Sequence, residues 1–521
     1  MRAAVAAGGT SVPLLECTIG DRLRETAARF PDRPALLWAE GDGLGRMTYA
    51  ELLAEAQRVA GWIARRTAPG DRVAIWSRNS VEWVLAEYGC ALSGTVVTAW
   101  NGAWTDPECA HAVDGTDPRL VLAGRDVRGV DLLDRARSLG ARGRVHDLSA
   151  LRALAGSEPP AALPPVAPDD LFLLQFTSGT TGRPKAAALS HRAALNGAWI
   201  RARLHGTDEH DVLHNPVPMT HVGGALAMVL GAMAVGSAYV LMPRFDEAEY
   251  LRLLRLTGAT RLGGVPTMLL RLLDHPDWVP PPAGQVRSTG LGGSSISPRL
   301  VERLRAEIRA PVFATYGQSE CLMVSSTRLD DDPAVVTDTV GRVVPHVELS
   351  IRDPLSGRQL AVGEAGEICV RTVCAAGGYF GAPEASAQAF TPDGFLRTGD
   401  LGSLDEQGFL RVQGRVRDVV IRGGENVYPA EVEEVLGQHP AVAAVAVVGV
   451  PDERWGQQVG AAVVLREGAD PAPRALEAFA AERLAHFKVP RVWRFEATLP
   501  VTAVGKVRKV EVEELFRAGG G

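Results

Sequence analysis

A loop rich in glycine and hydroxyl side chains is the part of the chain best suited to chemistry. It reads Thr177-Ser-Gly-Thr-Thr-Gly-Arg-Pro-Lys185 and follows the apolar run from Leu171 to Phe176. Its glycines allow a tight turn, its hydroxyls and backbone amides can face one anion, and Lys185 adds a positive charge. Only two residues separate Gly179 from Gly182, so the spacing is not that of the common P-loop. The loop predicts a site for the phosphates of a nucleoside triphosphate, with an ordinary surface turn as the alternative.

Four other short stretches place charged or hydroxyl-bearing residues beside glycines. They are Tyr316-Gly-Gln-Ser-Glu320, Thr398-Gly-Asp400, Gly414-Arg-Val-Arg-Asp418 and Pro500-Val-Thr-Ala-Val-Gly-Lys506. The first is expected to follow a strand at residues 311–315, and the second to follow an apolar run that ends at Leu396. Considered singly, Glu320 and Lys506 are typical of solvated loop residues, and Thr398-Gly-Asp400 is typical of a turn. Only their order along the chain can distinguish these stretches from ordinary loops and turns.

The first third of the chain supplies alternating strands and helices to position these stretches. Apolar residues at helical spacing predict helices, and short apolar runs predict strands. The expected helices are Thr18–Phe30, Tyr49–Ala64 with Thr48 as its N-cap, and Val81–Ser93; the expected strands are Pro34–Trp38, Arg72–Trp76 and Gly94–Ala99. Such alternation is typical of a mostly parallel sheet that is covered by helices on both faces.

The rest of the chain divides into two further patterns. After helices expected at 193–203 and 225–234, short alternating strands at Val347–Arg352 and Gly366–Arg371 predict a small antiparallel unit. Beyond Gly414–Asp418, helices and strands alternate again over about a hundred residues, which is an ordinary domain size. We therefore predict an α/β protein: a large N-terminal domain of helix-covered sheets with a small β-barrel-like unit, followed by a small α+β C-terminal domain. The expected domains are residues 1–416 and 417–521.

Composition narrows the class of protein. The 521 residues are 46% hydrophobic and 22% charged, which is typical of a globular protein with more than one domain. A net charge of −6 argues against a nucleic-acid partner, because such proteins usually carry clustered basic residues. The six cysteines show no metal-binding spacing and are expected to be buried in a reducing compartment. With no apolar stretch of membrane-spanning length, we expect a cytoplasmic protein.

Taken together and in this order, the five motifs resemble those of the adenylate-forming superfamily of acyl-CoA synthetases, adenylation domains and luciferases. The resemblance extends from about Thr18 to Phe516, nearly the whole chain. Fatty-acyl and medium-chain acyl-CoA synthetases are most similar, on the strength of Gly341–His346, Arg422–Pro429 and His486–Pro490. The resemblance implies ATP, Mg²⁺ and coenzyme A as substrates and cofactor. In the implied reaction, a carboxylate attacks the α-phosphate of ATP to give an acyl-adenylate, and a thiol then displaces AMP.

The resemblance also assigns the nucleotide-binding residues. The loop would hold the β- and γ-phosphates, and Glu320 with Thr180 would bind Mg²⁺, a hard cation that suits carboxylate and phosphate oxygens. Tyr316 would stack on adenine, Asp400 would accept both ribose hydroxyls, and Arg415 would bind ribose or phosphate from the other side. Ser319 would donate to the α-phosphate, although the family more often has threonine there. The ATP-binding set is Thr177, Ser178, Gly179, Thr180, Thr181, Gly182, Lys185, Gly293, Ser294, Ser295, Tyr316, Gly317, Ser319, Asp400 and Arg415.

Two residues of the C-terminal domain are assigned to different steps. The resemblance implies that Lys506 stabilises charge at the α-phosphate during adenylation, whereas Gly424 lines the pantetheine tunnel during thioester formation. One orientation of the domain cannot serve both steps. The family's solution is a mobile C-terminal domain that rotates about a hinge, here Arg417, where the family generally has aspartate or lysine.

The resemblance also identifies residues that would surround the acyl group. His221 occupies the position of a catalytic gate, with a hydrogen-bonded core histidine as the alternative, and His221, Val222, Gly223, Gly293, Cys321 and Met323 are expected to line the acyl pocket. Residues 215–224 contain no Asp or Glu for a substrate ammonium, so we expect an apolar acid. We predict an AMP-forming acid–thiol ligase that makes an acyl-CoA. Transfer to a carrier protein, a luciferase-like oxidase, a non-catalytic relative and a homodimeric assembly stay open.

Overall fold

The computed structural model describes residues 2–125, 130–139, 144–177, 184–293, 296–423, 425–501 and 507–518. The chain forms two compact units. The larger unit contains Ala6–Leu349 and Val370–Leu396, and the smaller unit contains Met1–Val5, Ser350–Cys369 and Arg397–Gly521. The predicted domain boundary at residue 417 lies within the smaller unit and stays a prediction.

A six-stranded sheet in the larger unit has the strand order β7-β6-β4-β5-β8-β9. Its pairs are parallel except for β8 and β9, which form an antiparallel pair at one edge. The strands are β4 (Arg72–Trp76), β5 (Val96–Ala99), β6 (Leu120–Ala123), β7 (Arg144–Asp147), β8 (Leu171–Thr177) and β9 (Lys185–Ser190). The strand expected at 72–76 is confirmed, the one expected at 94–99 begins at Val96, and the apolar run at 171–176 forms β8. Strand β9 was not predicted.

A nine-stranded sheet is the second sheet of the larger unit, with the order β16-β15-β14-β13-β12-β10-β11-β2-β3. Its central pairs are parallel, and β3, β15 and β16 are antiparallel to their neighbours. The strands are β2 (Pro34–Glu40), β3 (Gly43–Thr48), β10 (Val212–His214), β11 (Ala238–Leu241), β12 (Arg261–Gly264), β13 (Ser288–Gly292), β14 (Val312–Gln318), β15 (Cys321–Ser326) and β16 (Arg342–Val343). The strand predicted at 34–38 therefore belongs to this sheet, because it pairs with β11, and not to the sheet of its sequence neighbours.

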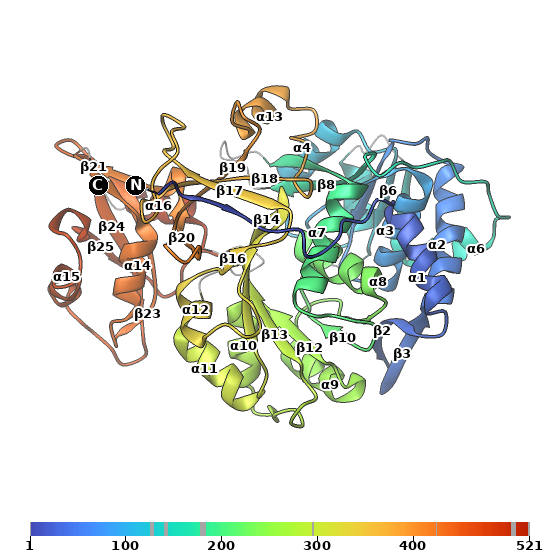
Figure 1. The fold of residues 1–521 in the computed structure, drawn as a ribbon, viewed down its shortest axis with the longest axis horizontal. Coiled ribbons are helices and arrows are strands. Elements are labelled where there is room, and N and C mark those ends of the chain that lie inside the picture. Colours follow the sequence, from blue (N-terminus) through green and yellow to red (C-terminus); the bar gives the residue numbers. More distant parts are fainter. Residues whose placement is uncertain are drawn as a thin grey trace. The chain divides into compact units, whose positions relative to one another are not determined.

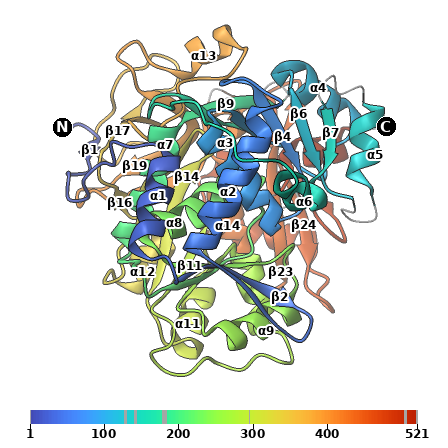
Figure 2. The same cartoon turned by 90° about the vertical axis from the view of Figure 1, so that its right-hand side faces the viewer.

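A layer of helices lies between the two sheets and forms the main core. It contains α1 (Ile19–Arg29), α2 (Tyr49–Ala64), α3 (Val81–Ser93), α7 (His191–Leu204), a π-helix η2 (Gly223–Leu230) and α8 (Gly231–Val235). Figures 1 and 2 both show α1, α2 and α3 side by side in this layer. Thr18 and Thr48 cap α1 and α2 in capping boxes with Asp21 and Glu51. Helix α2 therefore begins where the sequence predicts, and α1 begins one residue later than expected because Thr18 is its N-cap.

The outer faces of both sheets carry their own helices. On the six-stranded sheet, α4 (Asp106–Thr116) and α5 (Leu132–Ser138) cover a cluster that includes Trp76 and Trp100. On the nine-stranded sheet, α9 (Glu247–Thr257), α10 (Pro266–Leu273), α11 (Pro298–Glu307) and α12 (Pro333–Asp338) cover a second cluster. The prediction of sheets covered on both faces is confirmed.

The smaller unit contains the C-terminal α+β fold. Strands β21 (Val420–Arg422), β22 (Glu425–Val427), β23 (Val442–Asp452), β24 (Gly456–Leu465) and β25 (Val492–Phe495) form one sheet. It packs with α14 (Pro429–Gly437) and α15 (Pro473–Ala481) around a buried cluster, and α16 (Lys509–Ala518) packs on β23. Helices and strands therefore alternate in this part of the chain, as the sequence predicts.

A further five-stranded sheet has the order β1-β17-β18-β19-β20, and the division between the units falls within its strands. Its strands are β1 (Val5–Ala7), β17 (Val347–Arg352), β18 (Gly366–Thr372), β19 (Leu396–Leu404) and β20 (Leu410–Arg415). Strands β17 and β18 occupy the ranges that the alternating pattern predicts. None of the helices that the structure describes has the length and hydrophobicity to cross a lipid bilayer.

Candidate functional site

The predicted phosphate loop connects the two strands of a hairpin. Thr177 at the end of β8 lies opposite Lys185 at the start of β9, and the Thr177 hydroxyl lies 3.5 Å from the Lys185 carbonyl oxygen. His111 on α4 supports the far end of the loop by donating from Nε2 to the Pro184 carbonyl oxygen at 3.0 Å. The structure therefore anchors both ends of the loop at an edge of the six-stranded sheet. The loop residues Ser178, Gly179, Thr180, Thr181 and Gly182 lie outside the described residues.

Glu320 and Lys185 both contact one aromatic side chain, Tyr379. The Tyr379 hydroxyl donates to Glu320 Oε1 at 2.8 Å, and Lys185 Nζ lies 5.5 Å from the centre of the Tyr379 ring. The predicted metal ligand and the predicted phosphate-binding lysine therefore lie in the same part of the larger unit. All three side chains are partly exposed, so they remain accessible to a ligand.

The stretch from Tyr316 to Glu320 differs in one respect from the prediction. Strand β14 continues to Gln318, so Tyr316 and Gly317 lie within the strand and not after it. The register shifts between Tyr316 and Gln318, and a Cβ on Gly317 would lie 2.0 Å from the Leu322 carbonyl oxygen. Because β15 pairs back closely onto β14, only glycine fits there. Ser319 and Glu320 form the turn between the two strands, which places the carboxylate at the sheet edge.

A second glycine turn follows the neighbouring strand β13. Gly293 has φ of 87°, a left-handed conformation that favours glycine, and it is exposed. A Cβ on Gly292 would lie 2.7 Å from Thr315 Oγ1, so the strand also needs glycine at its end. Gly293 therefore follows β13, and Tyr316 lies within the neighbouring strand β14, two residues before its end; their contact with adenine stays a prediction. Ser294 and Ser295 lie outside the described residues.

Two amides that the sequence did not single out hold the loop that carries His221. Gln175 on β8 donates from Nε2 to the Thr220 carbonyl oxygen at 2.9 Å. Asn79 accepts from Met219 N at 2.7 Å and donates to the Val217 carbonyl oxygen at 3.1 Å. The loop after β10 is thus tied to the strand that leads into the phosphate loop. The only sequence signal for Gln175 is that it is a polar residue within an apolar run.

His221 is an exposed residue of this loop. Its Nδ1 accepts a hydrogen bond from Gly223 N at 3.0 Å, so in the neutral ring the proton is on Nε2. The alternative of a core histidine is therefore wrong, because the side chain is exposed. The π-helix η2 begins at Gly223, where a single helix was expected from Ala225 to Ala234. π-Helical turns are rare and occur frequently at functional sites.

The other residues assigned to the acyl pocket differ in exposure. Val222, Cys321 and Met323 are almost completely buried, whereas Gly223 is partly exposed. Burial raises the pKa of the Cys321 thiol well above its ordinary value, and the thiol donates to the Met323 carbonyl oxygen at 3.5 Å. Cys321 is therefore a small apolar residue and not a nucleophile at neutral pH.

Asp400 and Arg415 lie together in the smaller unit. Arg415 Nε is 3.0 Å from Asp400 Oδ1, and the two residues face each other in register on β19 and β20. Asp400 was expected at the end of a strand, and this was wrong: β19 continues to Leu404 because β20 pairs with it. Arg417 follows in a 3₁₀ turn and pairs with Asp418 at 3.3 Å. Gly424 and Lys506 lie outside the described residues.

The donor set around Glu320 fits a magnesium ion that is held mainly by substrate. Within the described ranges, no group of three or more His, Cys, Asp or Glu side chains could hold a metal ion. Mg²⁺ often binds through one or two carboxylates together with substrate phosphates and water, and it does not require an all-protein cage. The Tyr379 hydrogen bond occupies Oε1 of Glu320, so Oε2 could bind such an ion.

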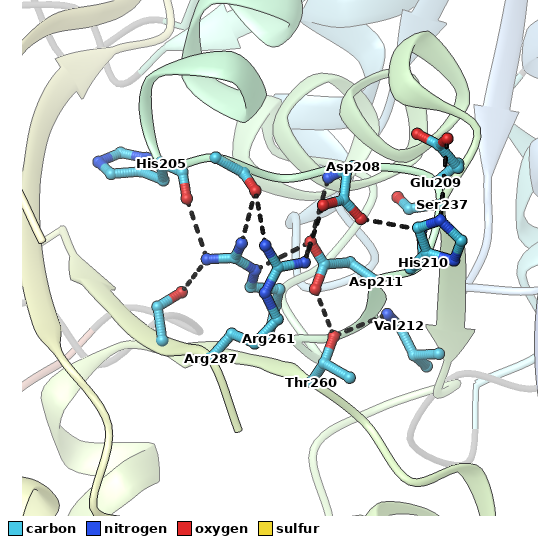
Figure 3. A network of polar contacts seen from close by, with 12 residues as sticks. His205, Asp208, Glu209, His210, Asp211, Val212, Ser237, Thr260, Arg261 and Arg287 are labelled. Atoms are coloured by element: carbon cyan, nitrogen blue, oxygen red, sulfur yellow. Dashed lines mark hydrogen bonds and ion pairs between the residues drawn. The ribbon is translucent and has the colours of Figure 1, made fainter. Parts of the chain in front are cut away.

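An ion-pair network centred on the buried Asp211 ties together the opposite, amino-terminal ends of strands in the nine-stranded sheet (Figure 3). Asp211, before β10, lies 3.1 Å from Arg261 Nε and 2.9 Å from Arg287 Nη1, and it accepts from Thr260 Oγ1 at 2.7 Å. Arg261 Nε is not aligned for a hydrogen bond, but its Nη atoms donate to backbone carbonyls. Arg287 also pairs with Asp208 at 3.0 Å. Figure 3 shows these charges converging on Asp211, so the network fixes the strands that carry the site at their other ends.

The chain belongs to the AMP-binding enzyme family. The family's sequence model matches residues 23–380, and the model of the AMP-binding enzyme C-terminal domain matches residues 431–506. With the fold and the motifs, this identifies an adenylate-forming enzyme of the acyl-CoA synthetase type, an AMP-forming ligase that makes thioester bonds.

Individual relatives agree with this class over nearly their whole lengths. The chain is 34% identical to the 3-[(3aS,4S,7aS)-7a-methyl-1,5-dioxo-octahydro-1H-inden-4-yl]propanoyl:CoA ligase of Rhodococcus jostii (strain RHA1), covering 95% of this chain and 98% of the relative. It is 30% identical to a mitochondrial medium-chain acyl-CoA ligase of Macaca fascicularis, covering 97% and 88%. Among solved structures, o-succinylbenzoate CoA synthetase from Bacillus subtilis, in complex with its acyl-adenylate intermediate, has a TM-score of 0.83 at 29% identity, covering 96% and 99%.

Proposed function

We propose that this protein activates an apolar carboxylic acid as its acyl-adenylate and transfers the acyl group to the thiol of coenzyme A. The observation that carries the proposal is the joint contact of Glu320 and Lys185 with Tyr379, beside the hairpin that holds the phosphate loop. This arrangement offers one carboxylate and one ammonium group to a triphosphate. The apolar substrate is supported by the absence of Asp and Glu from residues 215–224.

In the first proposed step, a carboxylate oxygen of the acid attacks the α-phosphorus of ATP. The bond between the α-phosphorus and its bridging oxygen breaks, and pyrophosphate leaves with the electron pair. Lys185 and the backbone of the loop hold the leaving phosphates, and Glu320 holds Mg²⁺. When bound, Mg²⁺ neutralises charge on the phosphates, which lowers the repulsion between two anions. Lys506 stabilises the charge that develops at the α-phosphate.

In the second proposed step, the thiol of coenzyme A loses its proton to water and attacks the acyl carbon. The bond between that carbon and the phosphate oxygen breaks, and AMP leaves with the electron pair. Gly424 lines the path of the pantetheine arm, so the C-terminal domain rotates about Arg417 between the steps. His221, exposed at the end of its loop, acts as the gate beside the acyl group. Asp400 and Arg415 hold the ribose, with the arginine fixing the carboxylate through their ion pair.

The substrates named for two relatives narrow the chemical class of the acid. Relatives of this chain act on a propanoyl group that carries a bicyclic ring and on medium-chain acyl groups. The proposed substrate class is therefore an acid whose carboxylate is followed by an apolar chain or ring. Delivery to a carrier protein, a homodimeric assembly and a cytoplasmic location stay predictions.

The test is pyrophosphate release from ATP across a panel of linear, alicyclic and aromatic acids, with and without coenzyme A. We expect acid-dependent release with at least one acid and, when coenzyme A is present, a thioester that mass spectrometry detects. If pyrophosphate release requires a phosphopantetheinyl carrier protein, that protein and not coenzyme A is the acceptor of the acyl group. No acid-dependent release with any member of the panel, from protein that binds ATP, would refute the proposal.

Lys506→Ala divides the two steps. Removing one positioned charge-stabilising group typically costs about a hundredfold or more in rate, so adenylate formation should fall by that factor. Thioester formation from supplied acyl-adenylate should fall much less. Lys509→Ala is the matched control, because Lys509 lies three residues further on and pairs with Glu433 at 2.8 Å. Equal losses in both half-reactions for Lys506→Ala would contradict the division of labour.

A further inference from the structure

A short segment, residues 375–380, connects strand β9, which begins at Lys185, with the turn that carries Glu320. At one end, Ala376 N donates to the Glu320 carbonyl oxygen at 2.7 Å, and Ala375 bridges to Cys321. At the other end, the segment pairs with β9: Gly377 N donates to the Ala188 carbonyl oxygen at 2.9 Å. The segment therefore joins the edge of the six-stranded sheet to the edge of the nine-stranded sheet. Its backbone is fixed by hydrogen bonds on both sides.

Tyr379 is held in place within this segment. Its backbone bridges to Ala187, its N–H donates to Ser386 Oγ at 2.8 Å, and the Ser386 hydroxyl donates back to the Tyr379 carbonyl oxygen at 3.1 Å. A side chain on such a fixed backbone has few positions to choose from. The hydroxyl end of the ring meets Glu320 and the face of the ring meets Lys185.

This geometry separates two opposite charges that would otherwise attract each other. A lysine and a glutamate in one partly exposed site tend to pair, and such a pair would neutralise both groups before a nucleotide arrives. The structure describes no ion pair between Lys185 and Glu320; each contacts Tyr379 instead. The phenol donates a hydrogen bond to the carboxylate, and the ring face attracts the ammonium group. Tyr379 thus orients both charged groups, and neither group is neutralised by the other.

We propose that Tyr379 is a positioning residue of the nucleotide site, which orients the Glu320 carboxylate and holds Lys185 apart from it, so that both remain available to a divalent cation–ATP complex. This inference rests on the proposed function, because it takes Glu320 as the metal ligand and Lys185 as the phosphate ligand. It goes beyond it by naming a residue that none of the five motifs contains. Tyr379 acts through its two neighbours and need not touch the substrate.

Tyr379→Phe removes the hydroxyl and keeps the ring, and Tyr379→Leu removes both contacts. The probe is Mn²⁺ with a non-hydrolysable ATP analogue, because bound Mn²⁺ is measured directly by electron paramagnetic resonance without turnover. A hydrogen bond to a charged group is stronger than one between neutral groups, but solvent weakens the bond from Tyr379 to Glu320 because both side chains are partly exposed. Tyr379→Phe should therefore weaken Mn²⁺ binding about three- to tenfold. Tyr379→Leu should also weaken binding of the metal-free analogue about two- to fivefold, because the contact with Lys185 is lost.

A double-mutant cycle shows whether the effect passes through Glu320. In a Glu320→Gln background, Tyr379→Phe should change Mn²⁺ affinity by less than about twofold, because the charged partner is already gone. Tyr49→Phe is the matched control. It removes a buried hydroxyl that donates to the Ala232 and Ser237 carbonyl oxygens, so it should lower the melting temperature and leave Mn²⁺ affinity unchanged.

Two outcomes would overturn the inference. Unchanged Mn²⁺ affinity in Tyr379→Phe would overturn it, and so would an equal loss in the Glu320→Gln background. If Tyr379→Leu does not fold, Tyr379→Phe and the cycle still decide. Failure of the proposed function would look different: wild-type protein would release no pyrophosphate with any acid, whatever the variants bind. If the wild-type protein releases pyrophosphate with an acid and Tyr379→Phe binds Mn²⁺ as tightly as the wild type, the positioning role of Tyr379 is refuted and the proposed function is not.

Discussion

Glu87→Gln replaces a carboxyl group in the core of the larger unit with a neutral amide of nearly the same shape. Glu87 lies on α3 with none of its surface exposed, and among the described residues neither carboxyl oxygen has a hydrogen-bond partner. Burial raises its pKa well above the ordinary value of 4.5, because an ionised carboxylate in the core would lose its hydration. The native protein therefore holds this group protonated at pH values where the unfolded chain has released the proton.

The sign and size of the effect follow from that difference. Above about pH 4.5 the unfolded state binds fewer protons than the native state, so the free energy of unfolding falls as pH rises, until the native pKa is reached. The slope is at most about 1.4 kcal/mol per pH unit for one group. Glutamine has no proton to lose, so Glu87→Gln should become more stable relative to wild type by up to about 2.7 kcal/mol between pH 5.5 and 7.5.

Urea unfolding of both proteins at pH 5.5, 6.5 and 7.5, followed by tryptophan fluorescence, measures this difference. Trp83 lies on the same helix as Glu87 and is fully buried, so the signal reports on the relevant core. Glu82→Gln makes the same chemical change on a partly exposed carboxyl of α3 and controls for the altered charge. A stability difference for Glu87→Gln that does not grow with pH, or grows no more than in the control, would refute the reasoning.

Three further predictions concern the hinge, the ion-pair network and acid stability. Arg417→Pro fixes φ at the hinge and should slow thioester formation more than adenylate formation; unchanged single-turnover transfer to coenzyme A would argue against the hinge. Asp211→Asn leaves two arginines without their buried carboxylate and should lower the free energy of unfolding by about 3–5 kcal/mol, measured by urea unfolding. Burial lowers the pKa of His214 and His191 to about 4, so the stability that both neutral rings contribute above pH 6.5 should be lost progressively between pH 6.5 and 4. In His214→Gln the free energy of unfolding should fall less steeply over this range, and an equally steep fall would contradict the lowered pKa of His214.

Elements with complete local signals could be predicted from the sequence alone. Helix α2 and strand β4 have the predicted bounds, because threonine caps, apolar periodicity and short apolar runs are properties of neighbouring residues. Strand β9 was missed because its small residues, Lys185–Ser190, carry no strong strand pattern. The π-helix η2 was missed because one extra residue per turn leaves an apolar run looking like any other helix.

Pairing between distant strands could not be predicted in the same way. Strand β2 follows α1 directly in the sequence, yet it pairs with β11, about two hundred residues later. No local pattern encodes such a partner, since strands of both sheets are equally apolar. Recognition of the family motifs supplied the fold class that local patterns left open, and the comparisons confirm it.

The site shows the same division between local and distant signals. The motifs at Thr177–Lys185 and Tyr316–Glu320 could be read because their glycines and charges are adjacent in sequence. The supports of these motifs could not: Gln175, Asn79 and Tyr379 each make their decisive hydrogen bond to a residue at least 45 positions away. Of these three, only Gln175 leaves a signal in the sequence, as a polar residue within an apolar run.

The charges of the larger unit are distributed in a way that separates stability from binding. At the amino-terminal ends of β10, β12 and β13, the buried Asp211 pairs with the buried Arg261 and with Arg287, whose side chain is exposed. At the start of β9 and in the turn after β14, Lys185 and Glu320 are partly exposed and are kept apart by Tyr379. Breaking a buried pair destabilises the fold because it leaves a buried charge without a partner, whereas a binding site needs charges that are oriented but still available. Asp211→Asn should therefore lower stability with little change in Mn²⁺ affinity, and Tyr379→Phe should do the reverse.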